Sequence, residues 1–418
     1  MYDVKRAYEL LEKISFERMG GSEEELKAAN ILKEEIEKCG ISAHFEEFEI
    51  NHSDIVEATL EVVEPFNKTY NVTGVKMTGN TSDEGVCAPF VYIEDANDGN
   101  LIDVEGKIVL INGRIMHKIY KKLIEKKVAG FICISGSIYD DLNKTDLDVY
   151  SIREKDIELG KIPGVTLRAI DAQELADLNP SKVKITLKQN EGKRVSRNVV
   201  CEIKGSVYPD EIIAFTAHYD SVKFSSGAYD NATGSVGIME LFHHFVENKP
   251  KRTLRFIWCG SEELGLLGSK AHVEQHKEEL DKYKFCLNID MIGVILGKEI
   301  AVATADTSLV NYVSYVANEV GVPLTARQGV YSSDSTPFAD KGVPSISFAR
   351  ISPMGGAKIH TRQDVISTIK AEAFDSSLKV MLEFSTRLDN SVIFPIPRVI
   401  PENMKLELDY YNLRKDRP

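Results

Sequence analysis

The sequence predicts an α/β fold in which helices sandwich a mixed, largely parallel sheet, with a mostly β domain inserted near the start. Two observations support the α/β part. From about residue 195 onward, short apolar runs alternate with helical stretches. These runs are continuously apolar, which is typical of strands that helices cover on both faces. A third observation supports the insertion: residues 56–192 consist of short β-rich runs broken by polar loops.

The N-terminal segment predicts two amphipathic helices and a strand. Residues 2–15 and 22–39 show helical periodicity. Ser22 is the expected N-cap of the second helix, because acidic residues follow it in the first turn. That helix should end at Cys39-Gly40. The alternating stretch SAHFEEFEI predicts a half-exposed strand.

The remaining elements follow in order. Within residues 56–192 we expect several strands and one or two helices, one of them in KIYKKLIEKK. Beyond residue 195 the expected strands are NVVCEI, EIIAFTA, TLRFIWC, KFCLNID, EIAVAT and PSISFAR. The expected helices between them lie near 233–247, 264–279, 307–320 and 371–388. Residues 1–55 and 193–418 should therefore form one domain and 56–192 another, with 391–418 as an apolar, proline-punctuated docking tail.

The composition excludes several classes of function. Acidic residues outnumber basic ones, 64 to 51, so the formal charge is −13 and neither nucleic acid nor an anionic membrane is an expected partner. The six cysteines are scattered, and four lie inside apolar runs, which predicts free thiols in a reducing compartment. No signal sequence or membrane-length apolar run is found, so we expect a cytoplasmic protein. The oligomeric state stays open.

Polar residues follow three of the predicted strands where each one ends. EIIAFTA leads into His218 and Asp220, TLRFIWC into Glu262 and Glu263, and KFCLNI into Asp290. Two loops add Asp230 and His360. In open α/β sheets, ligands bind at the carboxyl ends of the strands, so we expect these side chains to meet.

The residue types then indicate a metal site. The chain has no G-x-S-x-G, H-E-x-x-H, G-x-x-x-x-G-K-[ST] or G-x-G-x-x-G motif. Histidines and carboxylates form an N/O donor set that suits zinc, with cobalt or manganese as substitutes. Two ions about 3.5–4 Å apart need a bridging carboxylate and roughly two further protein ligands each.

The available side chains fill these positions. Asp230 is the expected bridge, His218 and Asp290 the ligands of one ion, and Glu263 and His360 the ligands of the other. Glu262 then has no metal to bind and is the candidate general base. Asp220 is the expected acceptor that fixes the tautomer of the His218 imidazole.

Taken together, the motifs resemble the di-zinc aminopeptidases of metallopeptidase family twenty-eight. The resemblance rests on AHYDSV, DNATG, SEELGLLGS, NIDMIG, SSDSTPFADKGVPSI and IHTRQD, in this order. It implies the phosphorylase/hydrolase-like zinc-exopeptidase fold, and it implies the same roles for the five ligands and for Glu262. The inserted segment is similar to a protease-associated (PA) domain through GKIVLINGR, KKVAGFICISG and IPGVTLRAIDAQEL.

The implied activity is hydrolysis of the N-terminal peptide bond of a peptide by a water that bridges two zinc ions, with Glu262 as the base. The sequence departs from the family pattern in two places. Where relatives often carry a tyrosine before the last histidine, this chain has Ile359, so Tyr219, Tyr229, Tyr331 or the metal could stabilise the oxyanion. The usual S-D-H is Ser333-Asp334-Ser335 here.

Other functions remain open. A carboxypeptidase or another amide hydrolase could use the same metals, and its cationic group would have to come from Arg327, Arg350 or Arg362. A cyclase on this fold would bind a single metal. A non-catalytic, receptor-like relative would lose metal ligands, whereas this chain keeps all five together with the base.

Several residues also have a purely structural interpretation. Adjacent glutamates usually form a solvated surface feature, although this pair follows a buried strand. Asp364 could support the site or cap a helix. The histidines expected to be structural lie on predicted helices: His243, His244, His272 and His276.

Overall fold

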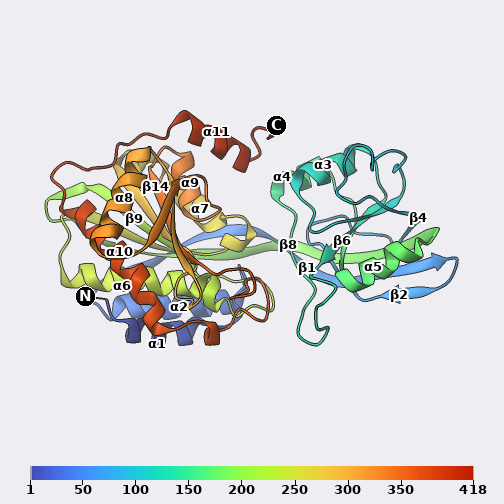
Figure 1. The fold of residues 1–418 in the computed structure, drawn as a ribbon, viewed down its shortest axis with the longest axis horizontal. Helices are drawn as coiled ribbons and strands as arrows, with labels where there is room; N and C mark the ends of the chain where they lie inside the picture. Colours follow the sequence, from blue (N-terminus) through green and yellow to red (C-terminus); the bar gives the residue numbers. More distant parts are fainter. Residues whose placement is uncertain (1, 418) are drawn as a thin grey trace. The chain divides into compact units, whose positions relative to one another are not determined.

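The computed structural model describes residues 2–417, and the chain divides into two compact units (Figure 1). One unit consists of Met1–Ile50 and Val195–Pro418, and the other of Asn51–Arg194. The chain leaves the first unit within strand β1 (Ala43–Glu64) and returns to it within strand β8 (Lys182–Ile203).

The sheet of the first unit is mixed and largely parallel, as the sequence predicts. Its strands follow the order β13-β12-β14-β11-β9-β10-β8. Only the β12–β14 and β8–β10 pairs are antiparallel, and the other four pairs are parallel. The strand bounds are β9 Tyr208–His218, β10 Arg252–Cys259, β11 Tyr283–Ile289, β12 Lys298–Thr304, β13 Leu324–Gln328 and β14 Ser345–Ile351.

Helices pack on both faces of this sheet. One core joins the sheet to α1, α2, α6, α8 and α10 and contains the fully buried Phe215, Phe256 and Trp258. A second core lies on the other face of the sheet. It joins the sheet to α7 and α9 through Val273 and Phe338. The helix bounds are α1 Val4–Ile14, α2 Glu23–Glu37, α6 Thr233–Glu247, α7 Leu267–Gln275, α8 Thr307–Glu319, α9 Ser335–Asp340 and α10 Ala371–Asn390.

Local sequence explains how α2 begins. The hydroxyl of Ser22 accepts a hydrogen bond from the Glu25 backbone N–H, so Ser22 is the N-cap of α2, as predicted.

The expected helix at 264–279 is interrupted. It consists of a short 3₁₀ turn, η2 (Glu262–Leu264), then α7, then η3 (Lys277–Lys282). The break follows from left-handed backbone at Gly265 and Leu266, with φ of 112° and 61°.

The second unit is built from strands and three helices. Strands β4 (Val86–Tyr92), β5 (Ile108–Ile111), β6 (Gly130–Ser135) and β7 (Gly164–Arg168) pair in parallel. Its other strands are β1, β2 (Lys68–Tyr70), β3 (Val72–Gly74) and β8. The helices are α3 (His117–Glu125), α4 (Glu154–Leu159) and α5 (Ala169–Leu178). The expectation of one or two helices was therefore too low, because the six residues of α4 are too few to show a period.

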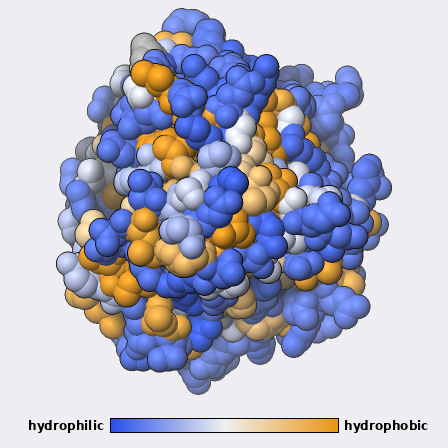
Figure 2. Space-filling view, turned by 90° about the vertical axis from the view of Figure 1, so that its right-hand side faces the viewer, coloured by the Kyte–Doolittle hydropathy of each residue, from blue (hydrophilic) through white to orange (hydrophobic). Residues whose placement is uncertain are grey.

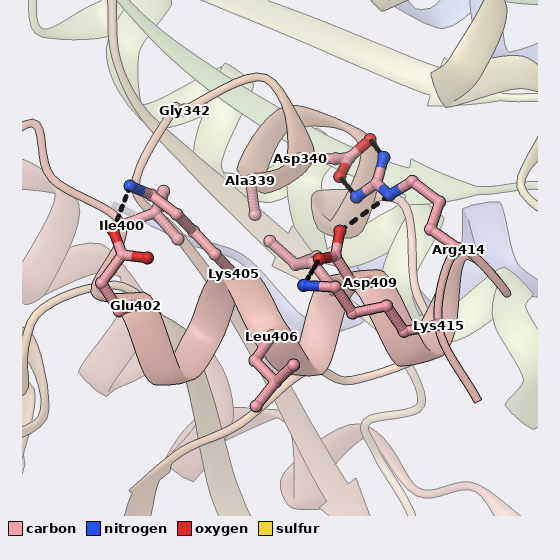
Figure 3. Close-up of a pocket in the computed structure, with 11 residues that line it drawn as sticks. Ala339, Asp340, Gly342, Ile400, Glu402, Lys405, Leu406, Asp409, Arg414 and Lys415 are labelled. Atoms are coloured by element: carbon pink, nitrogen blue, oxygen red, sulfur yellow. Dashed lines mark hydrogen bonds and ion pairs between the residues drawn. The ribbon is translucent and has the colours of Figure 1, made fainter. Parts of the chain in front are cut away.

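The C-terminal residues carry a helix, α11 (Glu402–Tyr411), that packs on α9. Met404 and Leu408 are buried against Ala339 and Ile400, and together they form a small core of their own. At the end of the helix, Arg414 forms ion pairs with Asp340 and Asp409 (Figure 3).

Two surface properties complete the description. The face seen in Figure 2 is mostly hydrophilic, with apolar residues in small scattered groups. Among residues 2–417, no helix is both long enough and apolar enough to cross a membrane.

Candidate metal centre

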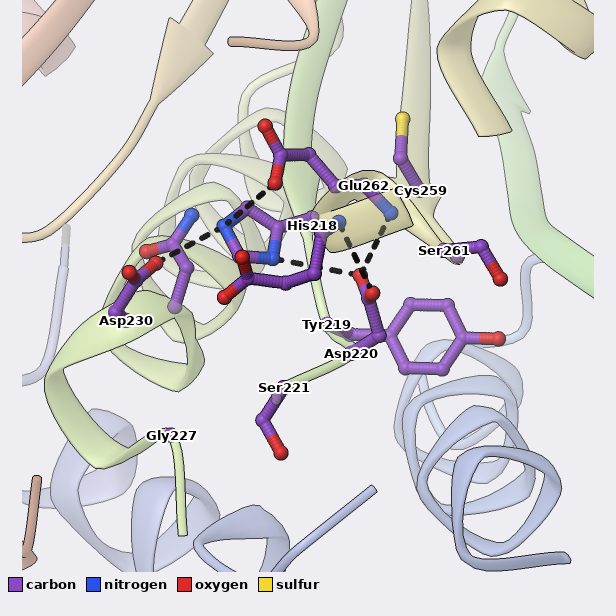
Figure 4. A network of polar contacts seen from close by, with 12 residues as sticks. His218, Tyr219, Asp220, Ser221, Gly227, Asp230, Cys259, Ser261 and Glu262 are labelled. Carbon is purple, nitrogen blue, oxygen red and sulfur yellow. Dashed lines mark hydrogen bonds and ion pairs between the residues drawn. The ribbon is translucent and has the colours of Figure 1, made fainter. Parts of the chain in front are cut away.

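Three neighbouring strand ends carry the polar residues of the candidate site. Strand β9 lies between β10 and β11 and is parallel to both. Its last residue is His218, while Glu262 and Glu263 follow β10 in η2, and Asp290 follows β11 directly. Parallel pairing therefore brings the three carboxyl ends to one edge of the sheet, where His218 and Glu262 face each other (Figure 4).

Two further residues reach this edge from loops. Asp230 lies in the short helical turn η1 (Ala228–Ala232) before α6, and His360 lies in the segment after β14. Asp230 directs one oxygen to each of two histidines. Its Oδ1 is 3.2 Å from Nε2 of His218, and its Oδ2 is 3.1 Å from Nε2 of His360.

The five predicted ligands fall into two groups that share Asp230. His218, Asp230 and Asp290 form one, and Asp230, Glu263 and His360 form the other; within each, the donor atoms lie within 4.8 Å of one another. The Oε2 of Glu263 is 3.0 Å from Nε2 of His360, and the Oδ1 of Asp290 is 3.7 Å from Nε2 of His218. The chain thus brings all five residues together.

The donor atoms fit two divalent cations. Oε1 of Glu263 and Oδ1 of Asp290 are buried without a hydrogen-bond partner among the described residues. A buried polar atom without a partner costs about 1–3 kcal/mol, so such an atom calls for a partner, which a water molecule or a bound ion can supply. Imidazole nitrogen and carboxylate oxygen are donors that zinc accepts.

The charges at the site shift the pKa values of its groups. Burial disfavours the imidazolium of His360, but hydrogen bonding to Asp230 and Glu263 raises its pKa to about 11. Burial likewise disfavours the imidazolium of His218, and the Glu262 carboxylate with the three aspartates around it raises that pKa well above its usual value. Negative charge is therefore in excess here, which favours the binding of cations.

Glu262 and Asp220 belong to neither ligand group. Burial raises the pKa of Glu262 well above its usual range, and the charge of Glu263 adds to the effect. Asp220 is fully buried and accepts hydrogen bonds from the backbone N–H groups of Glu262 (3.0 Å) and Glu263 (3.2 Å). Its Oδ1 is 3.4 Å from Nδ1 of His218, so Asp220 lies beside the imidazole and also holds the backbone of the glutamate pair.

The hydroxyl groups of two of the three candidate tyrosines are occupied elsewhere. Tyr219 donates to the carbonyl of Arg197 at 2.7 Å, and Tyr229 donates to the carbonyl of Arg350 at 2.6 Å. Burial and the charges of two candidate ligands raise the pKa of Tyr331, which keeps this phenol protonated next to the site.

Sequence reasoning missed the contribution of a buried arginine, Arg18, and left that of Asp364 undecided. The Arg18 side chain donates to the backbone carbonyl of Gly227 at 2.8 Å, in the loop before Asp230. Asp364 accepts from the backbone N–H of Asp230 at 3.1 Å. Neither contact leaves a signal in a single sequence, because both are made with backbone atoms.

A third cluster of potential ligands, around Glu46, is a hydrogen-bonded network instead. Its Oε2 is 2.7 Å from Nδ1 of His272, and its Oε1 is 2.8 Å from Nε2 of His276. The other ring nitrogens contact the hydroxyl of Tyr283 and the carboxylate of Glu279, at 3.0 and 2.6 Å. Every ring nitrogen has a partner here, so the two histidines have the structural role that the sequence suggested.

Solved structures share the fold of this chain. The chain matches a zinc aminopeptidase from Bacillus subtilis with a TM-score of 0.78 and 23% identity, over 96% of this chain and 99% of that one. An aminopeptidase from Aneurinibacillus sp. strain AM-1 matches with a TM-score of 0.76 and 21% identity, over 94% and 96%. These two likenesses show that the chain shares the α/β sandwich fold of both structures.

The sequence comparisons agree with this fold. Residues 198–385 match the model of peptidase family M28. It is 29% identical to the aminopeptidase YwaD of Bacillus subtilis (strain 168) over 393 residues, which cover 89% of this chain and 82% of the relative. It is also 26% identical to mouse carboxypeptidase Q over 290 residues, which cover 65% and 61%.

Proposed function

We propose that this chain is a two-zinc aminopeptidase that removes the N-terminal residue from peptides. The observation that carries the proposal is the pair of three-residue donor groups joined by one carboxylate, Asp230. His218 and Asp290 would hold one ion, Glu263 and His360 the other, and Asp230 both. When bound, zinc ions polarise the scissile carbonyl and lower the pKa of a water molecule from about 15.7 toward 7.

Glu262 is the proposed general base. It lies beside the ligands, with Oε2 3.9 Å from Nε2 of His218, and takes no part in either donor group. Its carboxylate would accept a proton from the attacking water and later deliver that proton to the nitrogen of the leaving amine. Asp220 would keep Glu262 in place through the backbone hydrogen bonds described above.

The partners of a nearby cation favour the amino end of a substrate over the carboxyl end. Binding of a C-terminal carboxylate would need a cationic side chain at the site. Arg350, a candidate for binding such a carboxylate, is already used. Its guanidinium donates to the carbonyls of Val294 and Ile295 and to the carboxylate of Glu299. We therefore rank a carboxypeptidase, the activity named for the mouse relative, second.

One experiment tests both the metal count and the substrate end. Zinc per chain is measured by elemental analysis, and the same sample is assayed on aminoacyl amides, on their N-acetylated forms and on peptides with a blocked N-terminus. We expect two zinc ions per chain and turnover of the free amines alone. Turnover of N-blocked peptides from the C-terminus would favour the carboxypeptidase, and a protein without zinc would contradict the proposal.

Two further expectations remain proposals. The Asn51–Arg194 unit would be a PA-like domain, and its parallel strands with flanking helices are compatible with this identity. A cytoplasmic location is supported by six cysteines that are all free, four of them buried. Fractionation of cells that produce the protein at its natural level would test the location.

A further inference from the structure

The loop that presents Asp230 has a tightly folded backbone that is hydrogen-bonded in part by groups from outside the loop. Gly227 adopts a left-handed conformation with φ of 55°. A Cβ atom at this position would lie 2.6 Å from the Cβ of Ser221 and 2.8 Å from the carbonyl oxygen of Asp230. Residues 226–230 are therefore tightly folded, and groups from outside the loop satisfy several of their polar atoms.

The first of these groups is Arg18, which precedes α2 and whose side chain is completely buried. Its guanidinium donates to the carbonyls of Ser226 and Gly227 at one end of the loop, and to that of Tyr219 at the other. The backbone N–H of Arg18 also donates to the hydroxyl of Ser221 at 3.0 Å. One cation thus joins both ends of the segment between His218 and Asp230.

The second group is Asp364, which lies four residues after His360 and is 1% exposed. One of its carboxylate oxygens accepts from the N–H of Tyr229 at 2.7 Å, and the other accepts from the N–H of Asp230 at 3.1 Å. Its backbone carbonyl accepts from the hydroxyl of Ser226. Asp364 therefore connects the segment of one candidate ligand, His360, to the backbone of another.

We propose that Arg18 and Asp364 are positioning residues that hold Asp230 where it can bind both metal ions. The inference rests on the proposed two-zinc function. Because Asp230 is the only side chain common to both donor groups, a displaced loop would weaken both sites together. Groups that orient metal ligands through hydrogen bonds typically change metal affinity about 10- to 100-fold when they are mutated.

The same protein contains a matched pair far from the ligands. Asp389 is 3% exposed and accepts from the backbone N–H groups of Lys251 (3.0 Å) and Arg252 (2.7 Å). Arg252 is 1% exposed and donates to the carbonyls of Leu388, Asp389 and Ser391. This pair makes the same kinds of backbone contact as Arg18 and Asp364, with an added ion pair from Arg252 to Glu211, and no candidate ligand takes part in them.

The experiment compares Asp364→Asn with Asp389→Asn in the full-length chain. Each variant replaces one accepting oxygen by an amide NH₂ that faces a backbone donor. Zinc affinity is measured by competition with a chromophoric chelator, and thermal unfolding is measured on the metal-free proteins. We expect both variants to unfold at similarly lowered temperatures, and only Asp364→Asn to lose about tenfold or more in zinc affinity. Arg18→Lys and Arg252→Lys repeat the comparison with charge retained, in case an Asn variant does not fold.

The outcomes separate the two proposals. If the wild-type chain binds no zinc, the proposed function is wrong and this inference fails with it. If the wild-type chain binds two zinc ions and Asp364→Asn binds them equally tightly, only the inference is wrong. An equal loss of affinity in Asp389→Asn would also overturn it, because the effect would then be one of general stability.

Discussion

Glu262 and Glu263 are adjacent in sequence but have different surroundings. Glu263 is 3.0 Å from the imidazole of His360, whereas Glu262 belongs to neither donor group. We predict that Glu262→Gln keeps both zinc ions and lowers turnover by about 100- to 10,000-fold, the usual contribution of a general base. Steady-state kinetics and zinc analysis on one preparation would check this. Near-normal turnover with metal bound would contradict the role given to Glu262.

Glu263→Gln should behave differently, although the chemical change is the same. Removing this carboxylate charge takes a ligand from the group that contains His360, so we predict a lower zinc content, with at least one ion lost on dialysis. Added zinc should restore part of the activity of Glu263→Gln and none of that of Glu262→Gln. If the two variants respond alike to zinc, the division of roles is wrong.

At the residue scale, the sequence predicts the site residues that lie at or just after strand ends. His218, Glu262 and Asp290 could be placed together because each lies within three residues of the end of an apolar run, and parallel strands present their carboxyl ends at one edge. The role of Arg18 could not be predicted, because it donates to backbone carbonyls, which every residue has. The choice among three tyrosines likewise required knowing which hydroxyl groups already have an acceptor.

At the scale of elements, the Glu46 network connects β1 to α7 and η3. Hydrogen bonding to Glu46 raises the pKa of His276 above its usual value of about 6.5. A histidine whose pKa is raised on folding stabilises the protein fully below its unfolded pKa, and the stabilisation is lost as the pH rises through the folded pKa. We therefore predict that His276→Gln lowers the free energy of unfolding at pH 6 and does so less at pH 9, as measured by urea denaturation.

His44→Gln provides the control for this prediction. His44 is also near Glu46, at 3.7 Å, but its side chain is 63% exposed, so its removal should change stability little at either pH. A difference between wild type and His276→Gln that does not change with pH would contradict the assignment of the charge to His276.

Helix α11 is held by an apolar core and by an ion pair, and the contributions of the two to stability can be measured separately. Leu408 is 2% exposed in the small core with Ala339, Ile400 and Met404, so Leu408→Ala should cost about 2 kcal/mol, near the lower end for buried leucines. Arg414 is nearly half exposed, so its ion pair with Asp340 should contribute about 1 kcal/mol or less. Hydrogen exchange within residues 402–411 should therefore speed up much more in Leu408→Ala than in Arg414→Ala, and the reverse order would contradict this.

The elements themselves were largely predictable, and their breaks were not. The six strands expected after residue 195 correspond to β8–β12 and β14, because short, continuously apolar runs are typical of strands buried on both faces. The helix expected at 264–279 is divided, because periodicity is averaged over a window and does not register single residues such as Leu266 in left-handed backbone. The interruption matters for function, since it separates the glutamate pair from α7.

For the whole molecule, the proposed metals should stabilise one unit and not the other. All five candidate ligands lie in the unit formed by Met1–Ile50 and Val195–Pro418. Ligands that bind only the folded state stabilise it by about 4 kcal/mol at 1,000 times the dissociation constant. We predict that chelation of zinc speeds hydrogen exchange around residues 218–230 and 360–364, while exchange within 51–194 stays unchanged. Equal changes in both units would contradict this.

The contacts of Arg18 and Asp364 with the Asp230 loop also limit when the site can form during synthesis of the chain. Its contacts join residue 18 to residues 219–227, and residues 229–230 to residue 364. A ribosome must therefore add 346 residues after Arg18 before the last of these contacts, at residue 364, can form. Residues 51–194 have their own apolar cores and are complete much earlier. During synthesis, all residues of the 51–194 unit are therefore present before the candidate metal ligands can gain their last partner.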